Sequence, residues 1–319
     1  MKYMFSGLIL SLSISVFAHT PEEKKALLES QETCGNFVHF DENNMFTGFG
    51  NYKELFEEPR NPMPGQMNIT SFETKMTSTI DTDDSVIDVA TDGNTAFVLT
   101  YSGIEEWNLE TKTRVAIHPT HTQTAVVYKE HAEQWARYND ELIIAHGIKG
   151  VSFFDMKTRK ITSTLELATS QYPLQSQTTG IAISGKFAYA VLDSYSIVDE
   201  APFPFKGIVK IDLETKKVVQ ELGGMDPGVD SIAAMGNKLI VSFYGFPVWK
   251  YDLTDFKPNA KKLPNPEIRV FRFPIAGHPW GHASLDDKNY YTCYWKRADE
   301  TNPRVKIPAV LDRSTLLLD

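Results

Sequence analysis

Two pairs of histidines have the spacing in this sequence that comes closest to a metal site. Two residues separate His118 from His121, and three separate His278 from His282. Imidazole nitrogens bind zinc, copper and iron, so either pair offers ligands for such an ion. Each pair encloses a proline, so a helix that would aim both rings at one ion is not expected. Hydrogen-bonded loop histidines explain the same spacing, so we expect no cofactor and keep a transition metal as the alternative.

A second group of residues has the chemistry of a ligand-binding groove. Aromatic rings offer flat apolar faces, and a few polar groups among them orient the ligand, which suits sugars, peptides or flat organic molecules. We predict ligand contacts for Tyr101, Trp135, His146, Asp193, Tyr244, Trp280, His282 and Trp295. For Trp135 and Tyr244 a plainer interpretation is that their rings fill the space between neighbouring structural units.

Motifs of well-known catalytic sites are absent from the sequence. It contains no Gly-x-Ser-x-Gly nucleophile elbow, no phosphate-binding glycine loop and no Cys-x-x-Cys-His haem site. The neighbouring carboxylates Asp83-Asp84 and Asp286-Asp287 would point to opposite sides of a strand, so they fit turns better than an acid/base pair. Catalytic residues are therefore unknown from the sequence, and whether the chain is an enzyme stays open.

The composition restricts the classes of partner. Of 319 residues, 42% are hydrophobic and 23% are charged, as in a soluble globular protein. The formal net charge is −9. Broad nucleic-acid or anionic-membrane surfaces need a dense positive field, so we expect neither kind of partner.

The N-terminus has the pattern of a secretory signal peptide. Lys2 is followed by the apolar run Phe5 to Phe17, and Val16-Phe17-Ala18 places small residues before a cut between Ala18 and His19. The run is too short to span a bilayer comfortably, so no membrane insertion is expected. We predict a signal peptide over 1–18, a charged leader over 19–33 that forms a short helix or stays mobile, and one domain over 34–319. The protein would be periplasmic or secreted.

Export changes how the two cysteines are interpreted. Cys34 and Cys293 are the only cysteines, and an oxidising compartment allows an even number of them to pair. A disulfide that closes so long a loop would stabilise the fold by ~4–5 kcal/mol in the chain-entropy model. The alternative is two buried thiols that never meet. The disulfide is the stronger prediction.

Internal repeats predict the architecture. Apolar first strands begin near residues 86, 134, 180, 231 and 282, at spacings of 48, 46, 51 and 51 residues. Each repeat offers four short strands, and four strands per ~40–50 residues is the pattern of a β-propeller blade. A degenerate copy ends near Thr82, and another closes the chain with strands at Pro308–Asp312 and Thr315–Leu318 around a turn at Arg313-Ser314.

The turn between the third and fourth strands carries a resemblance. It recurs at Asn108–Val115, Asp155–Thr162 and Asp212–Val219, with Glu-Thr-Lys in its first and third copies. These repeats resemble exported bacterial β-propellers of the quinoprotein-like and YncE-like repeat class, without pointing to one family. The resemblance implies an all-β propeller. Six blades fit the count, although the class often has seven, and the first and last blades would meet to close the ring.

Connection lengths predict a working face. In a four-stranded blade, the first-to-second and third-to-fourth turns share one end, and here they are short except for Asp255–Pro266. The other end carries the long segments Asn51–Gln66, Thr120–Glu133, Ala168–Thr178, Asp193–Lys206 and Trp295–Lys306. Long loops on a rigid scaffold commonly bind. We therefore predict a monomeric binding scaffold for a protein, peptide or glycan. The alternative is a lactonase-like hydrolase or lyase with a histidine and carboxylate site at the central channel, with or without a metal.

Overall fold

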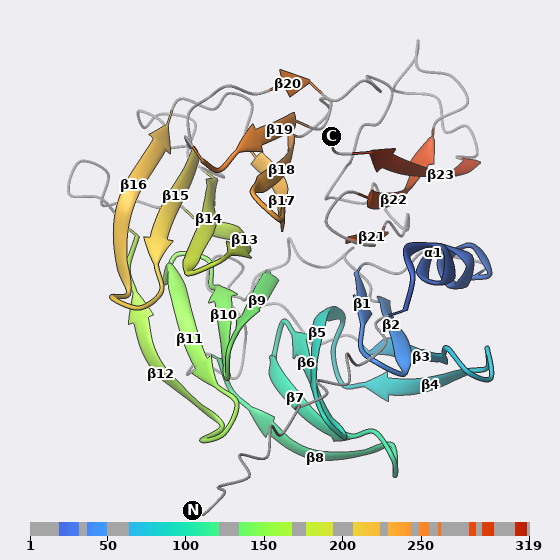
Figure 1. The fold of residues 1–319 in the computed structure, drawn as a ribbon. Helices are drawn as coiled ribbons and strands as arrows, with labels where there is room; N and C mark the ends of the chain where they lie inside the picture. Colours follow the sequence, from blue (N-terminus) through green and yellow to red (C-terminus); the bar gives the residue numbers. More distant parts are fainter. Residues whose placement is uncertain are drawn as a thin grey trace, which may run out of the picture.

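The computed structural model describes twelve segments of the chain, to which all structural statements below refer. They are residues 19–31, 37–49, 64–120, 134–167, 177–193, 207–223, 229–243, 249–254, 261–262, 281–284, 289–296 and 310–317. Their strands form six antiparallel sheets arranged around a central axis (Figure 1). The chain is therefore an all-β propeller with six blades in its described part, as the repeat spacing predicts.

Strand order within each sheet follows the chain, and the first strands lie nearest the central axis (Figure 1). The first blade consists of β1 (Val38–Phe40), β2 (Asn44–Phe49), β3 (Gly65–Ser71) and β4 (Thr77–Thr82). The second consists of β5 (Val86–Asp92), β6 (Thr95–Thr100), β7 (Gly103–Asn108) and β8 (Thr113–His118). The third consists of β9 (Gln134–Tyr138), β10 (Glu141–Ala145), β11 (Val151–Asp155) and β12 (Lys160–Leu165). The fourth consists of β13 (Gln177–Ser184), β14 (Phe187–Asp193), β15 (Gly207–Asp212) and β16 (Lys217–Gly223). The fifth consists of β17 (Val229–Met235), β18 (Lys238–Phe243), β19 (Trp249–Asp252) and β20 (Lys261–Lys262). The sixth consists of β21 (Gly281–Ser284), β22 (Asn289–Lys296) and β23 (Val310–Leu317).

The innermost strands bring the two ends of the propeller together. β1 contacts β5, β5 contacts β9, β9 contacts β13 and β13 contacts β17. β21 of the last blade contacts β1 of the first (Figure 1). The predicted contact between the N-terminal and C-terminal blades is thereby confirmed.

Two local predictions about strands are wrong. The expected turn at Arg313-Ser314 lies inside one continuous strand, β23, which pairs along all of β22. Continuing the ladder satisfies more backbone groups than a turn would, and this turn lacks the Glu-Thr-Lys residues found in other copies. The expected excursion Asp255–Pro266 contains β20, which pairs with β19.

The repeated third-to-fourth turn is held by its first side chain. The Oδ1 atom of Asp155 accepts hydrogen bonds from the backbone N–H groups of Lys157 and Thr158, at 2.9 and 2.6 Å. Asp212 accepts equivalent bonds from Glu214 and Thr215. These backbone hydrogen bonds lower the pKa of Asp155 and that of Asp212 below the ordinary aspartate value. The aspartate that opens the motif is therefore an Asx-turn residue.

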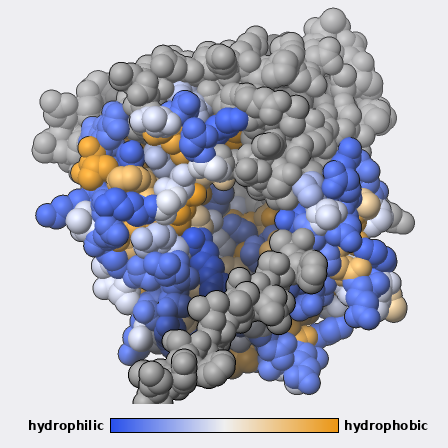
Figure 2. Space-filling model, in the orientation of Figure 1, coloured by the Kyte–Doolittle hydropathy of each residue, from blue (hydrophilic) through white to orange (hydrophobic). Residues whose placement is uncertain are grey.

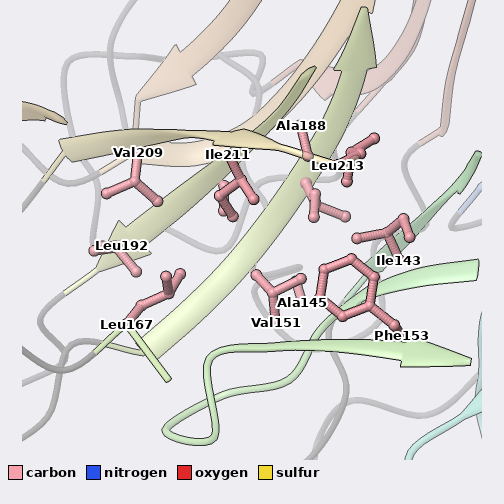
Figure 3. Packing of buried hydrophobic residues seen from close by; sticks show 12 residues of the cluster. Ile143, Ala145, Val151, Phe153, Leu167, Ala188, Leu192, Val209, Ile211 and Leu213 are labelled. Carbon is pink, nitrogen blue, oxygen red and sulfur yellow. The ribbon is translucent and has the colours of Figure 1, made fainter. Parts of the chain in front are cut away.

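The core is divided among the junctions between blades. Between the third and fourth blades, Ile143, Ala145 and Phe153 pack with apolar side chains of β14 and β15 (Figure 3). Both faces of a blade are covered by neighbours, so its inner strands are apolar on both sides. On the viewed side, described side chains at the surface are mainly hydrophilic (Figure 2).

The leader forms a helix that packs on the first blade. α1 (Pro21–Glu29) begins with a capping box between Thr20 and Glu23. Its buried Leu27 and Leu28 pack with Met45 and Phe72. Among the described residues, no helix has the length and apolarity needed to cross a membrane.

Candidate functional site

The two ends of the propeller differ in how their strands are connected. At one end, the first-to-second connections are 93–94 in the second blade, 139–140 in the third and 185–186 in the fourth. At the other end lie the second-to-third connections 50–64 and 194–206 and the inter-blade connections 119–133 and 166–176. We call these ends the tight-turn face and the loop-rich face. The strand boundaries therefore agree with the predicted division of connection lengths.

Three predicted ligand contacts lie at the loop-rich ends of strands in the second and third blades. Tyr101 follows β6 directly, and His146 follows β10 directly. Trp135 belongs to the core cluster shared by these two blades, together with Leu99 and Ile144. Because strand residues alternate, Tyr101 shares the face of Leu99, and His146 shares the face of Ile144.

Tyr101 and His146 follow second strands, one strand away from the innermost strands, whereas Trp135 lies on the innermost strand β9; all three side chains are buried. Tyr101 is 3% exposed, Trp135 4% and His146 1%. Trp135 packs between blades, which is the plainer of its two interpretations. His146 Nδ1 lies 2.8 Å from Ser152 Oγ, which lies 3.2 Å from Thr164 Oγ1. The His146 imidazole is therefore hydrogen-bonded within its own blade. The binding role of the three residues stays a prediction.

The other predicted contacts can be placed only in part. Asp193 ends β14, His282 lies in β21 and Trp295 lies in β22, at the expected strand positions. The structure does not describe their side chains, and Tyr244 and Trp280 lie outside the described residues.

Of the metal candidates, His118 is described and is part of an ion-pair network. Its Nε2 lies 2.9 Å from Glu106 Oε2, while Arg159 Nη2 lies 2.8 Å from Glu106 Oε1. Hydrogen bonds from Arg159 and His118 outweigh the effect of burial and lower the pKa of Glu106. His121 and His278 lie outside the described residues, as does Cys34. Within the described segments, no three His, Cys, Asp or Glu side chains group as metal ligands would.

Three buried polar atoms near the loop-rich face have no hydrogen-bond partner in the described structure. They are Trp135 Nε1, Thr178 Oγ1 and Thr179 Oγ1. Trp135 is the second residue of β9, and the two threonines follow the first residue of β13, so all three lie where innermost strands begin. A buried polar group without a partner costs about 1–3 kcal/mol.

Along the channel, one repeat position bridges neighbouring blades. Asp88 of β5 accepts a hydrogen bond from the backbone N–H of Trp135 in the next blade. At the same position in β9, Gln134 Oε1 accepts the N–H of Ile181 at 3.1 Å. The sequence interpretation missed both bridges. Aligning the repeats would have shown a polar residue at this position of otherwise apolar strands.

A second channel contact joins three blades. His39 Nε2 on β1 lies 3.2 Å from Thr91 Oγ1 on β5. Arg137 on β9 donates from Nη1 to the Thr91 carbonyl and from Nη2 to Asp92, at 3.3 Å. His39, Thr91 and Arg137 thus fasten the first three blades together on the channel side.

Burial shifts the pKa values of two channel groups in opposite directions. It lowers the pKa of His39 to about 4, with Asp41 raising and Arg137 further lowering that value. It raises the pKa of Asp88 to about 7, against the hydrogen bonds from the N–H groups of Val89 and Trp135. Near neutral pH, His39 is therefore uncharged and the Asp88 carboxyl is partly protonated.

Comparisons with known proteins assign neither a family nor an activity. No family model matches the sequence, and no curated protein does. Among solved structures, the WD40 domain of Pan2 from Neurospora crassa is similar, with a TM-score of 0.49 and 12% identity. The match covers 73% of this chain and 62% of that one. The similarity is one of fold alone, and the six sheets themselves identify the propeller.

Proposed function

We propose that this chain is an exported β-propeller that binds a protein, peptide or glycan ligand on its loop-rich face. The observation that carries the proposal is the division of connections, which places the long segments at one end of a rigid ring. Loops on a rigid scaffold can vary in shape without loss of the fold, and binding sites concentrate there. The signal-peptide pattern of residues 1–18 supports a periplasmic or extracellular location.

The unpartnered polar atoms support a position for part of the binding surface. Thr178 also forms backbone hydrogen bonds with Gly147, at 2.9 and 3.2 Å. The connection 146–150 of the third blade is thereby joined to the start of the fourth. The three atoms are buried, so a ligand with hydrogen-bonding groups, such as a peptide backbone or a sugar, would have to displace the atoms that cover them before it satisfied Trp135 Nε1 and the two threonine hydroxyls.

Substitutions that remove one polar atom each test this proposal. Immobilised wild-type protein is incubated with proteins and glycans from the producing organism's envelope and medium, and bound material is quantified by mass spectrometry. Thr178→Val and Trp135→Phe are expected to reduce capture. Thr178→Val removes a hydroxyl without a partner at nearly constant volume, so it should raise the free energy of unfolding by about 1 kcal/mol. Trp135→Phe also removes part of a ring packed in the core cluster, so it should lower that free energy, and its capture is compared at a temperature where the variant is fully folded.

The matched control is Thr70→Val. Thr70 is as buried as Thr178, but its Oγ1 lies 2.9 Å from Thr77 Oγ1. This variant should lose about 1 kcal/mol of stability and retain full capture. A bulky insertion between Gly93 and Asn94, on the tight-turn face, should also leave capture intact. If that insertion abolished capture while Thr178→Val and Trp135→Phe did not, the ligand would bind the opposite face and the proposal would be wrong.

A further inference from the structure

The described chain begins with a compact set of nitrogen and oxygen atoms beside the first turn of α1. The His19 imidazole stacks on the Phe72 ring, with centroids 3.6 Å apart and an interplanar angle of 17°. Its Nε2 lies 2.9 Å from the carbonyl oxygen of Glu42. A carbonyl oxygen only accepts hydrogen bonds, so Nε2 carries the hydrogen. In the neutral ring, Nδ1 then carries a lone pair.

Nδ1 lies beside an anchored carboxylate. His19 Nδ1 lies 3.6 Å from Glu23 Oε2. Thr20 holds Oε2 through its backbone N–H at 2.9 Å and its hydroxyl at 3.2 Å. Oε1 of Glu23 accepts no hydrogen bond from any described residue. Stacking, the Glu42 carbonyl and the capping box thus fix a nitrogen and a carboxylate close together.

We propose that cleavage after Ala18 completes a metal site here. Cleavage would convert the backbone nitrogen of His19 into a free amine. This amine and Nδ1 belong to one residue and can bind one ion as a chelate, with the Glu23 carboxylate as third ligand. The site depends on the proposed export and on cleavage at this peptide bond, but not on ligand binding at the loop-rich face.

The donor set indicates which ions would bind. Two nitrogens and one oxygen suit late divalent transition metals, among which Cu²⁺ binds most tightly. Histidines that bind metals usually donate their other N–H to a carbonyl or carboxylate, as Nε2 does here to Glu42. The positive end of a helix disfavours a cation, and the carboxylates of Glu22 and Glu23 in the first turn of α1 offset that effect.

The site is exposed to solvent, and protons compete with the metal ion for its ligand atoms. The side chains of His19 and Glu23 are 25% and 54% exposed. A protonated His19 would form an ion pair with Glu23, and a metal would displace that proton. Binding should therefore release protons and weaken as the pH falls.

The test compares two forms of the protein that differ only in the amine. Mature protein is purified from an exporting host, and its mass and N-terminal sequence are determined. Its affinity for Cu²⁺ is measured by calorimetry against a competing chelator, and its nitrogen ligands are counted by electron paramagnetic resonance. A form with a Gly/Ser extension of about six residues before His19 retains every side chain and should bind about 10- to 100-fold more weakly.

Two adjacent carboxylates provide the matched pair for the third ligand. Glu23→Gln keeps an oxygen for the capping box but removes the charged ligand, and should weaken Cu²⁺ binding about tenfold. Glu22→Gln, which changes the net charge equally in the same helical turn, should weaken it much less. The mature protein should also bind more tightly than a free peptide of residues 19–26, in which nothing orients the ring.

Three results would overturn the site: a mature N-terminus other than His19, equal affinity of the mature and extended forms, or equal affinity of the protein and the peptide. The first would also exclude the proposed cut. None of them would alter capture of a ligand by the loop-rich face, which Thr178→Val tests separately.

Discussion

At the scale of single residues, His39 and Asp88 make opposite contributions to the pH dependence of folding. The pKa of His39 is about 4 in the fold and 6.5 ordinarily, so between these values only the unfolded chain binds the proton. The contribution of His39 to the free energy of unfolding therefore decreases as the pH falls. The pKa of Asp88 is about 7 in the fold and 3.8 ordinarily, so in its window the folded chain retains the proton. The contribution of Asp88 to the free energy of unfolding therefore decreases as the pH rises.

Single substitutions should therefore reveal opposite slopes. Asp88→Asn retains an oxygen acceptor for the Trp135 N–H, and its free energy of unfolding should rise by about 1–3 kcal/mol from pH ~4.5 to ~6.5. Compared with the wild type, His39→Gln should show a fall of similar size over the same range, because His39 no longer offsets the contribution of Asp88. Urea titrations at several pH values measure both slopes. Parallel curves for the two variants would contradict the assigned pKa shifts.

At the scale of elements, the repeated turn was predictable from the sequence, but the role of its basic residue was not. Lys112, Arg159 and Lys216 end equivalent turns, and each has a positive φ, between 52° and 60°. Arg159 reaches back to Glu106 of the preceding blade, and Lys216 Nζ lies 2.8 Å from Glu141 of its preceding blade. The motif specifies the local turn. The carboxylate that each cation meets depends on how blades pack, which no local pattern encodes.

Comparing equivalent turns measures the contacts of Arg159 with the preceding blade, which are the ion pair with Glu106 and the stacking of its guanidinium over the Phe97 ring. Arg159→Ala leaves Glu106, itself 7% exposed, with only His118 as a charged partner. Lys112→Ala places alanine at the same backbone conformation, with φ of 53° against 60°, and Lys112 is exposed. The cost of placing alanine at a positive φ is similar in the two variants, so it cancels in the comparison. Arg159→Ala should therefore be less stable than Lys112→Ala by about 1–3 kcal/mol in urea unfolding. Equal losses would show that the Glu106 network adds no stability.

Alanine substitutions at two glycines test whether the connection 146–150 is closely packed. Gly150 has φ of 88°, and a Cβ there would lie 2.2 Å from the carbonyl oxygen of Leu165. Gly93 has φ of 57° with no atom within 4 Å of such a Cβ. Gly93→Ala should cost about 1 kcal/mol from backbone strain alone. Gly150→Ala should cost at least ~2 kcal/mol more and reduce ligand capture, because the connection must shift. Thermal unfolding and the capture assay measure the two effects, and equal costs would contradict a close-packed connection.

The candidate site was only partly predictable, for a similar reason. Strand ends mark Tyr101 and His146 in the sequence, since a run of apolar residues stops there. Whether such a side chain faces the channel or a blade junction depends on alternation and on a neighbour about 45 residues away along the chain. Both side chains are buried. The same limit explains why the bridges from Asp88 and Gln134 were missed.

At the scale of the whole molecule, a period of 46–51 residues predicts the ring, and the contact of β21 with β1 closes it. A ring has one junction whose two blades are not joined directly along the chain. A cross-link there removes the most freedom from the unfolded chain, because the loop it closes is the longest. Cys293 lies in β22, paired with Gly281 of β21. Cys34 precedes β1 and lies outside the described residues, so the disulfide stays a prediction.

The prediction is that exported protein contains a Cys34–Cys293 disulfide that holds this junction. Intact mass should show no reactive thiol, and digestion without reduction should yield one peptide pair containing both cysteines. Reduction, or Cys293→Ser, should lower the free energy of unfolding by ~2–5 kcal/mol, and Cys34→Ser should do the same. The double variant should lose no more than either single variant, because one bond is lost in all three. Additive losses would instead indicate two independent buried thiols. In that case, closure of the ring would depend on the packing of β1 against β21 alone.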